Sequence, residues 1–283
     1  MPVPGLLAQI PTPPAGRTGW PWTEETPPNI YAALPASGQW PKLNIVCPSF
    51  RQGRFIEETL RSVLLQNYPA LEFIIIDGGS DDETVTILKK YSPWLAHWES
   101  EPDRGQSHAL NKGFTRATGE LFGWINSDDF YQPGAFAAIA AGYRHGRREL
   151  FFGDYEVRVG EEPALRRVRL LPAFAFQVRV GGRILPSHAT FWPRLVHQPF
   201  NESLQFIMDT DLFKRLGCAG VRPRHVPQSI SVFREHAAAK TATLDQVAND
   251  EMQVWFRAAP WYYKPLHRLS RVIDRLRQLG RKP

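Results

Sequence analysis

Cysteine is scarce in this sequence of 283 residues. Two cysteines, Cys47 and Cys218, cannot build a disulfide framework or a four-cysteine zinc site, and such low usage fits a reducing compartment. The sequence also lacks an apolar run near the ~18–20 residues that a transmembrane helix needs. Its first residues have no basic stretch, and their apolar stretch is too short for a signal peptide. We therefore expect a soluble, cytoplasmic protein in which both cysteines are buried and unreactive.

Most of the chain also lacks an excess of charge of either sign. The net charge is +6, and residues 261–283 account for all of it, with seven Lys and Arg against one acidic residue. A nucleic-acid-binding protein would carry basic residues on its folded body, so this class is disfavoured. In this tail, leucine and isoleucine recur at helical spacing beside arginines: Leu266, Leu269, Ile273 and Leu276, with Arg268, Arg271 and Arg275. Two interpretations stay open, a helix that adsorbs to an anionic membrane and a helix packed on its own domain.

Proline is concentrated at the other end of the chain. Residues 1–41 hold ten of the 25 prolines and only three charged residues. Proline at this density blocks helices and strand pairing, so we predict an extended arm. Trp20 and Trp22 could dock this arm on the domain, and a loose leader is the alternative. The sequence thus divides into a proline-rich arm (1–41), a domain (42–260) and a basic tail (261–283).

Within the domain, short apolar runs alternate with amphipathic segments. Strands are predicted over 43–47, 71–77, 94–99 and 120–125, and helices over 54–66, 82–91 and 105–117. Ser80 or Asp81 is the expected N-cap of the second helix. This alternation predicts a single α/β domain with a mostly parallel, twisted sheet. Residues 150–170 predict an antiparallel excursion and 244–256 a further helix.

Carboxylates follow three of the four predicted strands. Asp77, Asp103 and the pair Asp128-Asp129 stand where the second, third and fourth strands end. Ligands of parallel α/β sheets bind at the carboxyl ends of the strands, so these acids should meet in one crevice. They would repel a phosphate directly, but a divalent cation can bridge carboxylate and diphosphate oxygens. Taken alone, Asn126-Ser127-Asp128-Asp129 could equally be a polar turn before a helix.

The common nucleotide and hydrolase motifs are missing. The sequence has no G-x-G-x-x-G after the first strand, no G-x-x-x-x-G-K-[ST] and no G-x-S-x-G. Dehydrogenases, P-loop enzymes and α/β-hydrolases are therefore disfavoured.

Five segments, in matching order and spacing over about 90 residues, resemble the opening of the family 2 glycosyltransferases. They are Pro48-Ser49-Phe50, residues 76–82 (IDGGSDD), residues 101–114 (EPDRGQSHALNKGF), residues 117–120 (ATGE) and residues 124–129 (WINSDD). A weaker resemblance continues to about residue 240. The resemblance implies a Rossmann-like glycosyltransferase A (GT-A) fold and an inverting enzyme that uses a nucleotide sugar and Mg²⁺ or Mn²⁺.

The resemblance also implies roles for individual residues. Pro48, Ser49 and Asp77 would hold the nucleotide base, and Asp103 would lie near the base and ribose. Asn126 takes the first position of the family's D-x-D segment, where it can contact the ribose without supplying charge. Asp128, the last residue of that segment, would be the metal ligand.

The later segments imply the remaining roles. An inverting transfer needs a general base opposite the leaving diphosphate, and residues 208–216 (MDTDLFKRL) match the family's base segment with Asp209 as the base. Asp211 is the rival, and both acids could instead be ordinary first-turn helix residues. His236 would complete the metal shell or donate to the diphosphate, with a purely structural histidine as the alternative, and Lys240 would neutralise the diphosphate. His188 falls where a sugar could bind.

The expected function is therefore transfer of a hexose-type sugar from a UDP- or dTDP-linked donor to a glycan or lipid-linked acceptor, in cell-surface polysaccharide synthesis. The protein would be cytoplasmic, with peripheral contact to the cytoplasmic face of the membrane if the tail adsorbs there. Two alternatives stay open: a nucleotidyltransferase that makes sugar nucleotides, and a non-catalytic sugar-nucleotide or glycan-binding module.

Overall fold

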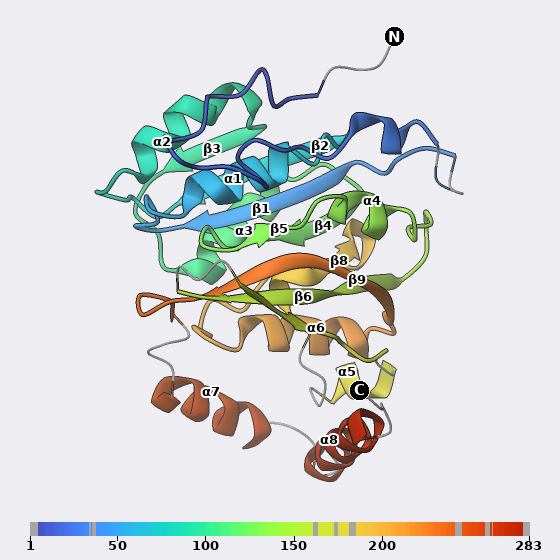
Figure 1. Ribbon diagram of the computed structural model, residues 1–283. Coiled ribbons are helices and arrows are strands. Elements are labelled where there is room, and N and C mark those ends of the chain that lie inside the picture. The colour runs from blue at the N-terminus through green and yellow to red at the C-terminus, as the bar shows by residue number, and fades with distance from the viewer. Residues whose placement is uncertain are drawn as a thin grey trace.

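One sheet runs through the whole domain in the computed structural model (Figure 1). The structure describes residues 5–33, 35, 38–160, 164–172, 175–180, 185–240, 245–257, 261 and 263–279. The strands are β1 (Leu43–Ser49), β2 (Leu71–Asp77), β3 (His97–Ser100), β4 (Leu121–Trp124), β5 (Phe130–Tyr131), β6 (Glu149–Val159), β7 (Leu165–Val168), β8 (Thr190–Pro193) and β9 (Arg222–Glu235). Their order is β3-β2-β1-β4-β8-β6-β9-β5, with β7 paired to β6.

The first half of the sheet carries the predicted motifs and is parallel. Strand β1 pairs in parallel with β2 and with β4, and β2 pairs in parallel with β3. Beyond β4 the sheet is mixed, because β8 runs antiparallel to both β4 and β6, while β6 and β9 are parallel. The predicted excursion over 150–170 is the antiparallel pair β6–β7. The loops after β1, β2 and β4 therefore meet at one edge.

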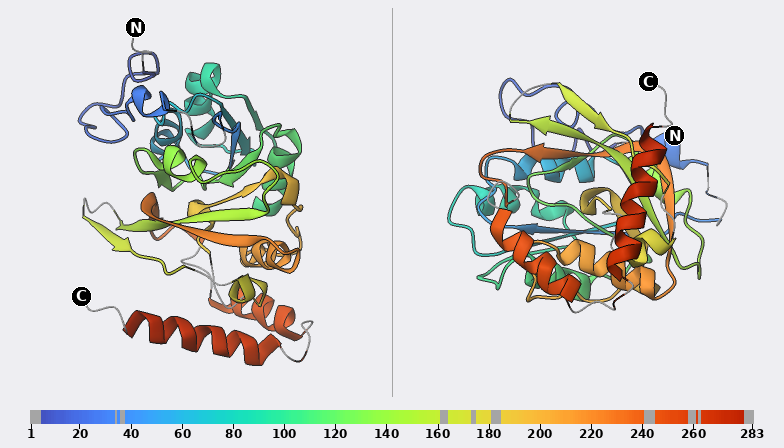
Figure 2. Two further views of the ribbon diagram at one scale, coloured as in Figure 1. Left: turned by 90° about the vertical axis from the view of Figure 1, so that its right-hand side faces the viewer. Right: turned by 90° about the horizontal axis from the view of Figure 1, so that it is seen from below.

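Helices cover both faces of the sheet (Figures 1 and 2). The helices are α1 (Ile56–Leu64), α2 (Thr84–Tyr91), α3 (Gln106–Arg116), α4 (Ala135–Ala140), α5 (Ala175–Arg179), α6 (Met208–Cys218), α7 (Asp245–Arg257) and α8 (Tyr263–Leu279). Short 3₁₀ turns lie at Pro28–Tyr31, Ser92–Trp94, Ser187–Ala189 and Arg194–Val196. None of the described helices is both long and apolar enough to cross a membrane.

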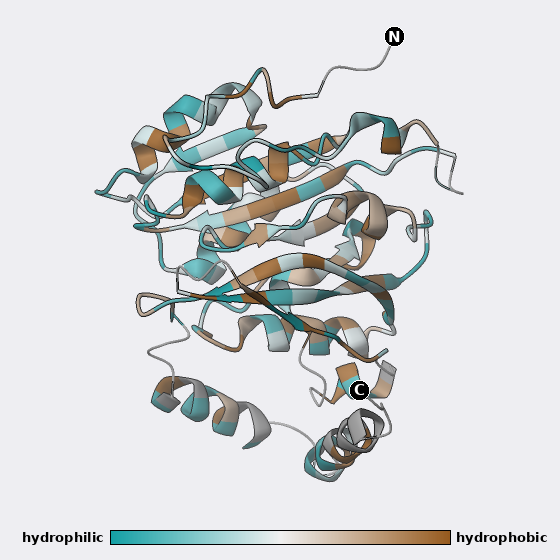
Figure 3. Cartoon of the chain, viewed as in Figure 1, coloured by the Kyte–Doolittle hydropathy of each residue, from teal (hydrophilic) through white to brown (hydrophobic). Residues whose placement is uncertain are grey.

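Strand β1 is buried on both sides, and Figure 3 colours most of it hydrophobic. Leu43, Ile45 and Cys47 join the core under α1, α2 and α4, whereas Val46 joins the core under α3 and α6. Such two-sided burial is why Ile45, Val46 and Cys47 are consecutive apolar residues instead of alternating with polar ones. Cys47 is buried as predicted, but the prediction for Cys218 was wrong, because it lies exposed at the end of α6.

The proline-rich arm is docked on the domain. The Trp20 indole donates to the Tyr131 carbonyl at 2.8 Å, and Trp22 is buried. Arg61 of α1 is completely buried, and its guanidinium donates to the backbone carbonyls of Pro11, Pro21 and Trp22 at 2.6–3.0 Å. The arm thus covers a polar stretch of α1 that the helix pattern alone leaves facing solvent.

Candidate functional site

The carboxyl edge of the parallel strands holds a cavity of about 570 Å³. Six predicted site residues line it: Pro48, Ser49, Asp103, Asn126, Asp128 and Lys240. Phe50, Gln52, Gly78, Gln106, Ser127 and Gln205 are among the other lining residues. The sheet therefore brings together residues that are up to 192 positions apart between Pro48 and Lys240. We call this space the larger cavity.

Glycines allow two loops of this cavity to approach each other. A Cβ atom on Gly78 would lie 3.1 Å from Asp103 Oδ2, and one on Gly79 would lie 3.1 Å from the Pro102 nitrogen. Gly79 also has a backbone φ of +83°, which residues with a side chain rarely adopt. The Gly78-Gly79 pair thus lets Asp103 lie against the end of β2.

Asp77 lies beneath the cavity and is absent from its lining. Its side chain is fully buried, and its oxygens accept hydrogen bonds from Ser80 N (2.8 Å), Ser80 Oγ (2.6 Å) and Ser100 Oγ (2.6 Å). In this arrangement Asp77 orders the loops after β2 and β3. A direct contact with a base stays a prediction.

Asp128 and His236 form the predicted metal-binding pair. His236 Nε2 lies 3.1 Å from Asp128 Oδ2, and the imidazole packs on the Phe55 ring at 4.5 Å. A carboxylate oxygen is a suitable ligand for Mg²⁺ or Mn²⁺, whereas an imidazole nitrogen suits a transition-metal ion such as Mn²⁺ better than Mg²⁺. The spacing of the two atoms lets one cation contact both. Among the described residues no group of three His, Cys, Asp or Glu could hold a metal. The pair thus fits a cation that takes its remaining ligands from a bound diphosphate and water.

A buried ion-pair network fixes the loop that carries Asp128. Arg234 donates through Nε to the Asp128 carbonyl (2.9 Å) and through its backbone N–H to Asp129 Oδ1 (2.9 Å). Glu58 of α1 accepts from both Arg234 (3.0 Å) and Arg158 (2.9 Å). Burial, and secondarily the charge of Asp128, raises the pKa of Asp129. Glu58 and Arg158 were not predicted as site residues, because their only signal in the sequence is a charge within a predicted helix or strand.

A smaller cavity of about 260 Å³ adjoins the larger one. Asp209 and His188 line it, together with Tyr155, Phe206, Met208 and Phe233. Gln106, Asn126, Gln205 and Lys240 line both cavities. Three of them form a hydrogen-bonded chain, because Gln106 Nε2 donates to Asn126 Oδ1 (2.7 Å) while Gln106 Oε1 accepts from Lys240 (3.2 Å). The two cavities therefore share one polar wall.

The two candidate bases differ in their surroundings. Burial raises the pKa of Asp209 to about 6, against hydrogen bonds from Thr210, whose N–H lies 2.6 Å from Oδ1. Asp211 is absent from the lining of both cavities, and its Oδ2 accepts from Arg215 Nε at 2.8 Å, one turn along α6. An acid with a pKa near neutrality that faces a cavity suits proton transfer. The geometry favours Asp209 over Asp211.

His188 and Lys240 both line the smaller cavity. His188 is buried, its Nδ1 lies 2.9 Å from Ser231 Oγ, and burial lowers its pKa to about 3. It is therefore a neutral, polar lining group near pH 7. Lys240 lies with its Nζ 5.1 Å from the Phe206 ring centre. Burial lowers the pKa of Lys240, whereas the charges of Glu251 and Asp209 raise it.

Phe50 is a lining residue to which the sequence analysis gave no role of its own. Its side chain is 53% exposed although it is a large apolar group at the end of β1. The neighbouring Arg51 has φ +53° and forms a two-pronged ion pair with Asp81 (2.8 Å each). An exposed aromatic ring at the mouth of a polar cavity provides a flat surface for a heterocyclic base.

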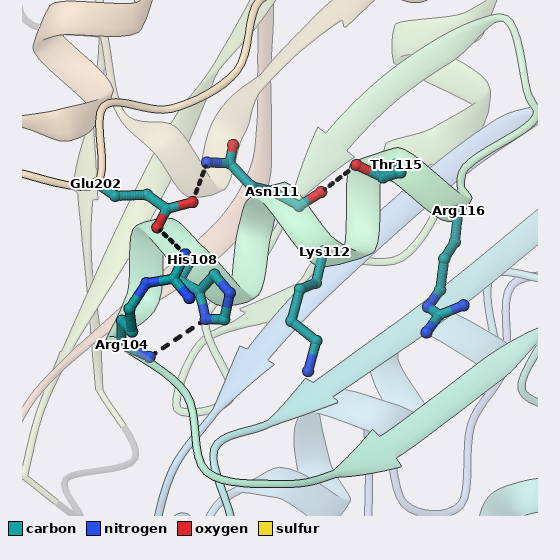
Figure 4. Close-up of a pocket in the computed structure, with 7 residues that line it drawn as sticks. All are labelled: Arg104, His108, Asn111, Lys112, Thr115, Arg116 and Glu202. Atoms are coloured by element: carbon teal, nitrogen blue, oxygen red, sulfur yellow. Dashed lines mark hydrogen bonds and ion pairs between the residues drawn. The ribbon is translucent and has the colours of Figure 1, made fainter.

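A separate hollow of about 390 Å³ lies on the other side of α3 (Figure 4). Its cationic side chains are paired: Arg104 with Glu202 (2.6 Å), and Arg116 with Glu99 (2.9 Å), while Lys112 also contacts Glu99. None of the predicted site residues lines it. Two carboxylates thus offset two of the three cationic charges of this hollow, and Glu99 is shared by Lys112 and Arg116.

Known proteins resemble this chain in sequence and in fold. A Mycobacterium tuberculosis protein (strain H37Rv) named as a glycosyltransferase is 32% identical over 157 residues, which cover 54% of this chain and 58% of that protein. The chain thus spans little more than half the length of this relative. A glycosyltransferase of Rickettsia felis is 24% identical over 228 residues, or 74% of this chain and 35% of that protein.

Two solved structures share the GT-A fold with this chain. A mannosyltransferase from Pyrobaculum calidifontis, solved with GDP-Man and Mn²⁺, gives a TM-score of 0.61 at 21% identity and covers 84% of this chain and 71% of that one. The S. aureus protein TarS, solved with UDP-GlcNAc, gives 0.58 at 17% identity, with 72% and 61% covered. The sequence model described as glycosyl transferase family 2 matches residues 44–204. This match spans more than half of the chain and includes the loops of the larger cavity up to Asp128, so the chain belongs to glycosyl transferase family 2.

Proposed function

We propose that this chain transfers a sugar from a nucleoside diphosphate sugar to a hydroxyl group of a glycan or lipid-linked acceptor, with inversion at the anomeric carbon. The observation that carries the proposal is the wall shared by the two cavities. A donor in the larger cavity and an acceptor in the smaller one would meet at Gln106, Asn126 and Lys240. A role in cell-surface polysaccharide synthesis is part of the proposal.

The larger cavity would hold the nucleotide. The base stacks on Phe50 between Pro48 and Ser49, with Asp103 beside the ribose and Asp77 beneath. Asn126 contacts the ribose or the first phosphate, and Lys240 offers a positive charge to the diphosphate. Asp128 and His236 would hold Mg²⁺ or Mn²⁺, which stabilises the negative charge that develops on the leaving diphosphate. Uridine or thymidine is the proposed base, and the neighbours' complexes with UDP-GlcNAc and GDP-Man support a nucleotide-sugar donor.

The smaller cavity would hold the acceptor. Asp209 accepts the proton of the acceptor hydroxyl as its oxygen bonds to the anomeric carbon and the bond to the diphosphate breaks. A pKa of about 6 leaves Asp209 mostly ionised at pH 7 and still basic enough to take the proton. His188, which is neutral, can hydrogen-bond a sugar hydroxyl without competing for the proton.

The two alternatives have less structural support. A nucleotidyltransferase needs cations from the loop after the first strand to bind a triphosphate, but Arg51 in this loop is paired with Asp81. A non-catalytic binding module is favoured by Asn126, which removes one carboxylate from the metal segment. A binding module, however, would not need an acid such as Asp209, whose pKa is raised, in the adjoining cavity.

A screen of nucleotide sugars tests the proposed function. We expect the chain to release nucleoside diphosphate from one UDP- or dTDP-sugar, faster with Mn²⁺ than with a chelator.

Asp128→Ala should abolish the metal-dependent part of nucleotide binding in calorimetry, and Asn126→Asp should keep or strengthen it by adding a carboxylate. Equal affinity with and without Mn²⁺ in the parent chain would exclude the proposed metal bridge.

The basic tail supports one further element of the proposal, contact with an anionic membrane surface. Helix α8 packs on α5, where Gln177 Nε2 donates to Ser270 Oγ at 3.1 Å, and Leu266 and Ile273 are half-buried. On the outside, Leu269 (50%), Val272 (52%) and the preceding Trp261 (87%) are exposed, next to exposed Lys264 and Arg268. The side chains of Arg271, Arg275 and Leu276 lie outside the described part of the chain. Exposed apolar groups beside basic ones suit adsorption to anionic lipid, which would place the enzyme at a lipid-linked acceptor.

A further inference from the structure

The wall of the smaller cavity continues beyond residues 44–204, which the family model matches. That match ends at residue 204, whereas Gln205, Phe206, Met208 and Asp209 all line the cavity. These residues form the entrance to α6 and its first turn.

A single carboxylate from α7 binds the segment. Glu251 accepts three backbone N–H groups: Gln205 N at 2.6 Å through Oε1, and Phe206 N at 3.0 Å and Ile207 N at 3.2 Å through Oε2. The N-cap residue of α6, Ile207, makes no side-chain capping hydrogen bond. A carboxylate that accepts several N–H groups just before a helix start forms strong, charge-assisted bonds and is favoured by the helix dipole.

The same carboxylate acts on the shared wall of the two cavities. The charge of Glu251 favours the protonated form of Lys240, which lies over the Phe206 ring and donates to Gln106. Glu251 thus fixes the backbone of two lining residues and supports the cation that faces them. In Figure 1, α7 lies below the sheet and below α6, far from β3 and β4, the strands that precede Asp103 and Asp128.

We propose that Glu251 is a positioning residue for the acceptor, and that α7 is thereby a working part of the acceptor site. The proposal rests on the proposed function for its assignment of the smaller cavity to the acceptor. Losing the carboxylate frees the backbone of residues 205–207, and Phe206 and Asp209 then lose their fixed places. Gln205 and Lys240 also line the larger cavity, so nucleotide affinity should fall slightly. Phe50, Asp103 and Asp128 come from other segments and should still hold most of the nucleotide.

Glu251→Gln in the full chain tests the proposal, because glutamine has the same shape but one acceptor oxygen, and its NH₂ group would face an N–H donor. The matched control is Asp250→Asn, since Asp250 is exposed on the same helix and accepts from Gln246 at 3.5 Å. The assay uses the nucleotide sugar that the parent chain turns over, with p-nitrophenyl hexosides as acceptors. Calorimetry measures nucleoside diphosphate affinity, and hydrogen exchange measures the amides of residues 205–207.

We expect Glu251→Gln to raise the acceptor KM at least tenfold, to change nucleotide affinity less than threefold, and to speed exchange at residues 205–207 at least tenfold. Asp250→Asn should change none of these. Unchanged exchange, or equal losses on the nucleotide and acceptor sides, would overturn the proposal. If the parent chain turns over no nucleotide sugar, the proposed function is contradicted. The exchange measurement needs no acceptor, so it still shows whether Glu251 holds the backbone of residues 205–207.

Discussion

At the scale of single residues, the environment of a side chain decides what chemistry it can do. Asp209 and Asp211 are two positions apart on α6 and look alike in sequence. One faces a cavity and has a pKa raised by burial to about 6, and the other is held by Arg215. The motif pointed to Asp209, and the surroundings now give a physical reason for that choice.

Phe50 gives a prediction at this scale. We expect Phe50→Ala to weaken nucleoside diphosphate binding by ~1–3 kcal/mol, the usual contribution of stacking one base on an aromatic ring. The ring is half-exposed, so the unfolding temperature should stay nearly unchanged. Calorimetry decides, with Leu195→Ala as the control because Leu195 is equally exposed and lies outside both cavities. Unchanged affinity in Phe50→Ala would show that the base binds elsewhere.

How far the sequence predicts the site follows from what each residue does. Residues of local motifs, such as Pro48, Asn126 and Asp128, were placed correctly at the cavity, because strand ends of a parallel sheet must meet. Glu58, Arg158 and Glu251 were missed, since each acts through contacts more than 40 positions away in sequence. Such contacts leave no local pattern.

At the scale of elements, hydrophobic periodicity predicted the first four strands and the helices between them within a few residues. The prediction that Ser80 or Asp81 is the N-cap of α2 was wrong, because Glu83 is the N-cap residue. Asp82 accepts from Thr84 N at 3.0 Å, whereas Ser80 is bound to Asp77 and Asp81 to Arg51. Each of the three polar residues could cap a helix, and only the tertiary partners decide among them. The mixed half of the sheet was predicted less fully, because its strands pair across long loops.

The anchor of the Asp128 loop gives a prediction at this scale. Glu58→Gln leaves the buried guanidinium of Arg234 without its counter-charge, and breaking such a pair costs about 3–5 kcal/mol of unfolding free energy. Asp81→Asn breaks the exposed pair with Arg51, so it should cost less than ~1 kcal/mol. Denaturant unfolding compares the two variants. Equal, small losses would mean that the network does not hold the loop.

At the scale of the whole molecule, segments outside residues 44–204, the range that the family model matches, pack on the domain and hold parts of it in place. The N-terminal arm covers Arg61 and binds β5 through Trp20, and α7 binds the segment just before α6. Composition identified the arm and the tail as separate segments, but could not say that they pack on the domain, because docking depends on surfaces that form only after folding.

The tail gives a prediction at this scale. The full chain should bind vesicles rich in phosphatidylglycerol at low salt and leave them at high salt, because each Lys or Arg near an anionic surface contributes ~1 kcal/mol that salt screens. A chain ending at residue 260 should stay folded, bind no vesicles and turn over a soluble substrate as before. A truncated chain that aggregates would instead assign α8 to the core.

The central claim is that the larger cavity binds the nucleotide while Asp209 acts as the base in the adjoining one. If so, transfer should fall as the pH drops below about 6, where Asp209 takes up a proton. The raised pKa also means that folding favours the protonated acid, so the stability contributed by this group is present at low pH and is lost as the pH rises from the unfolded value to about 6.

The most direct measurement compares nucleoside diphosphate affinity and sugar transfer in the parent chain and in Asp209→Asn. Asparagine has nearly the same shape but cannot accept the proton. The account predicts unchanged nucleotide affinity with transfer reduced by ~10²–10⁴-fold, the usual contribution of a general base. Near-parental transfer in Asp209→Asn, together with an inactive but folded Asp211→Asn, would contradict it.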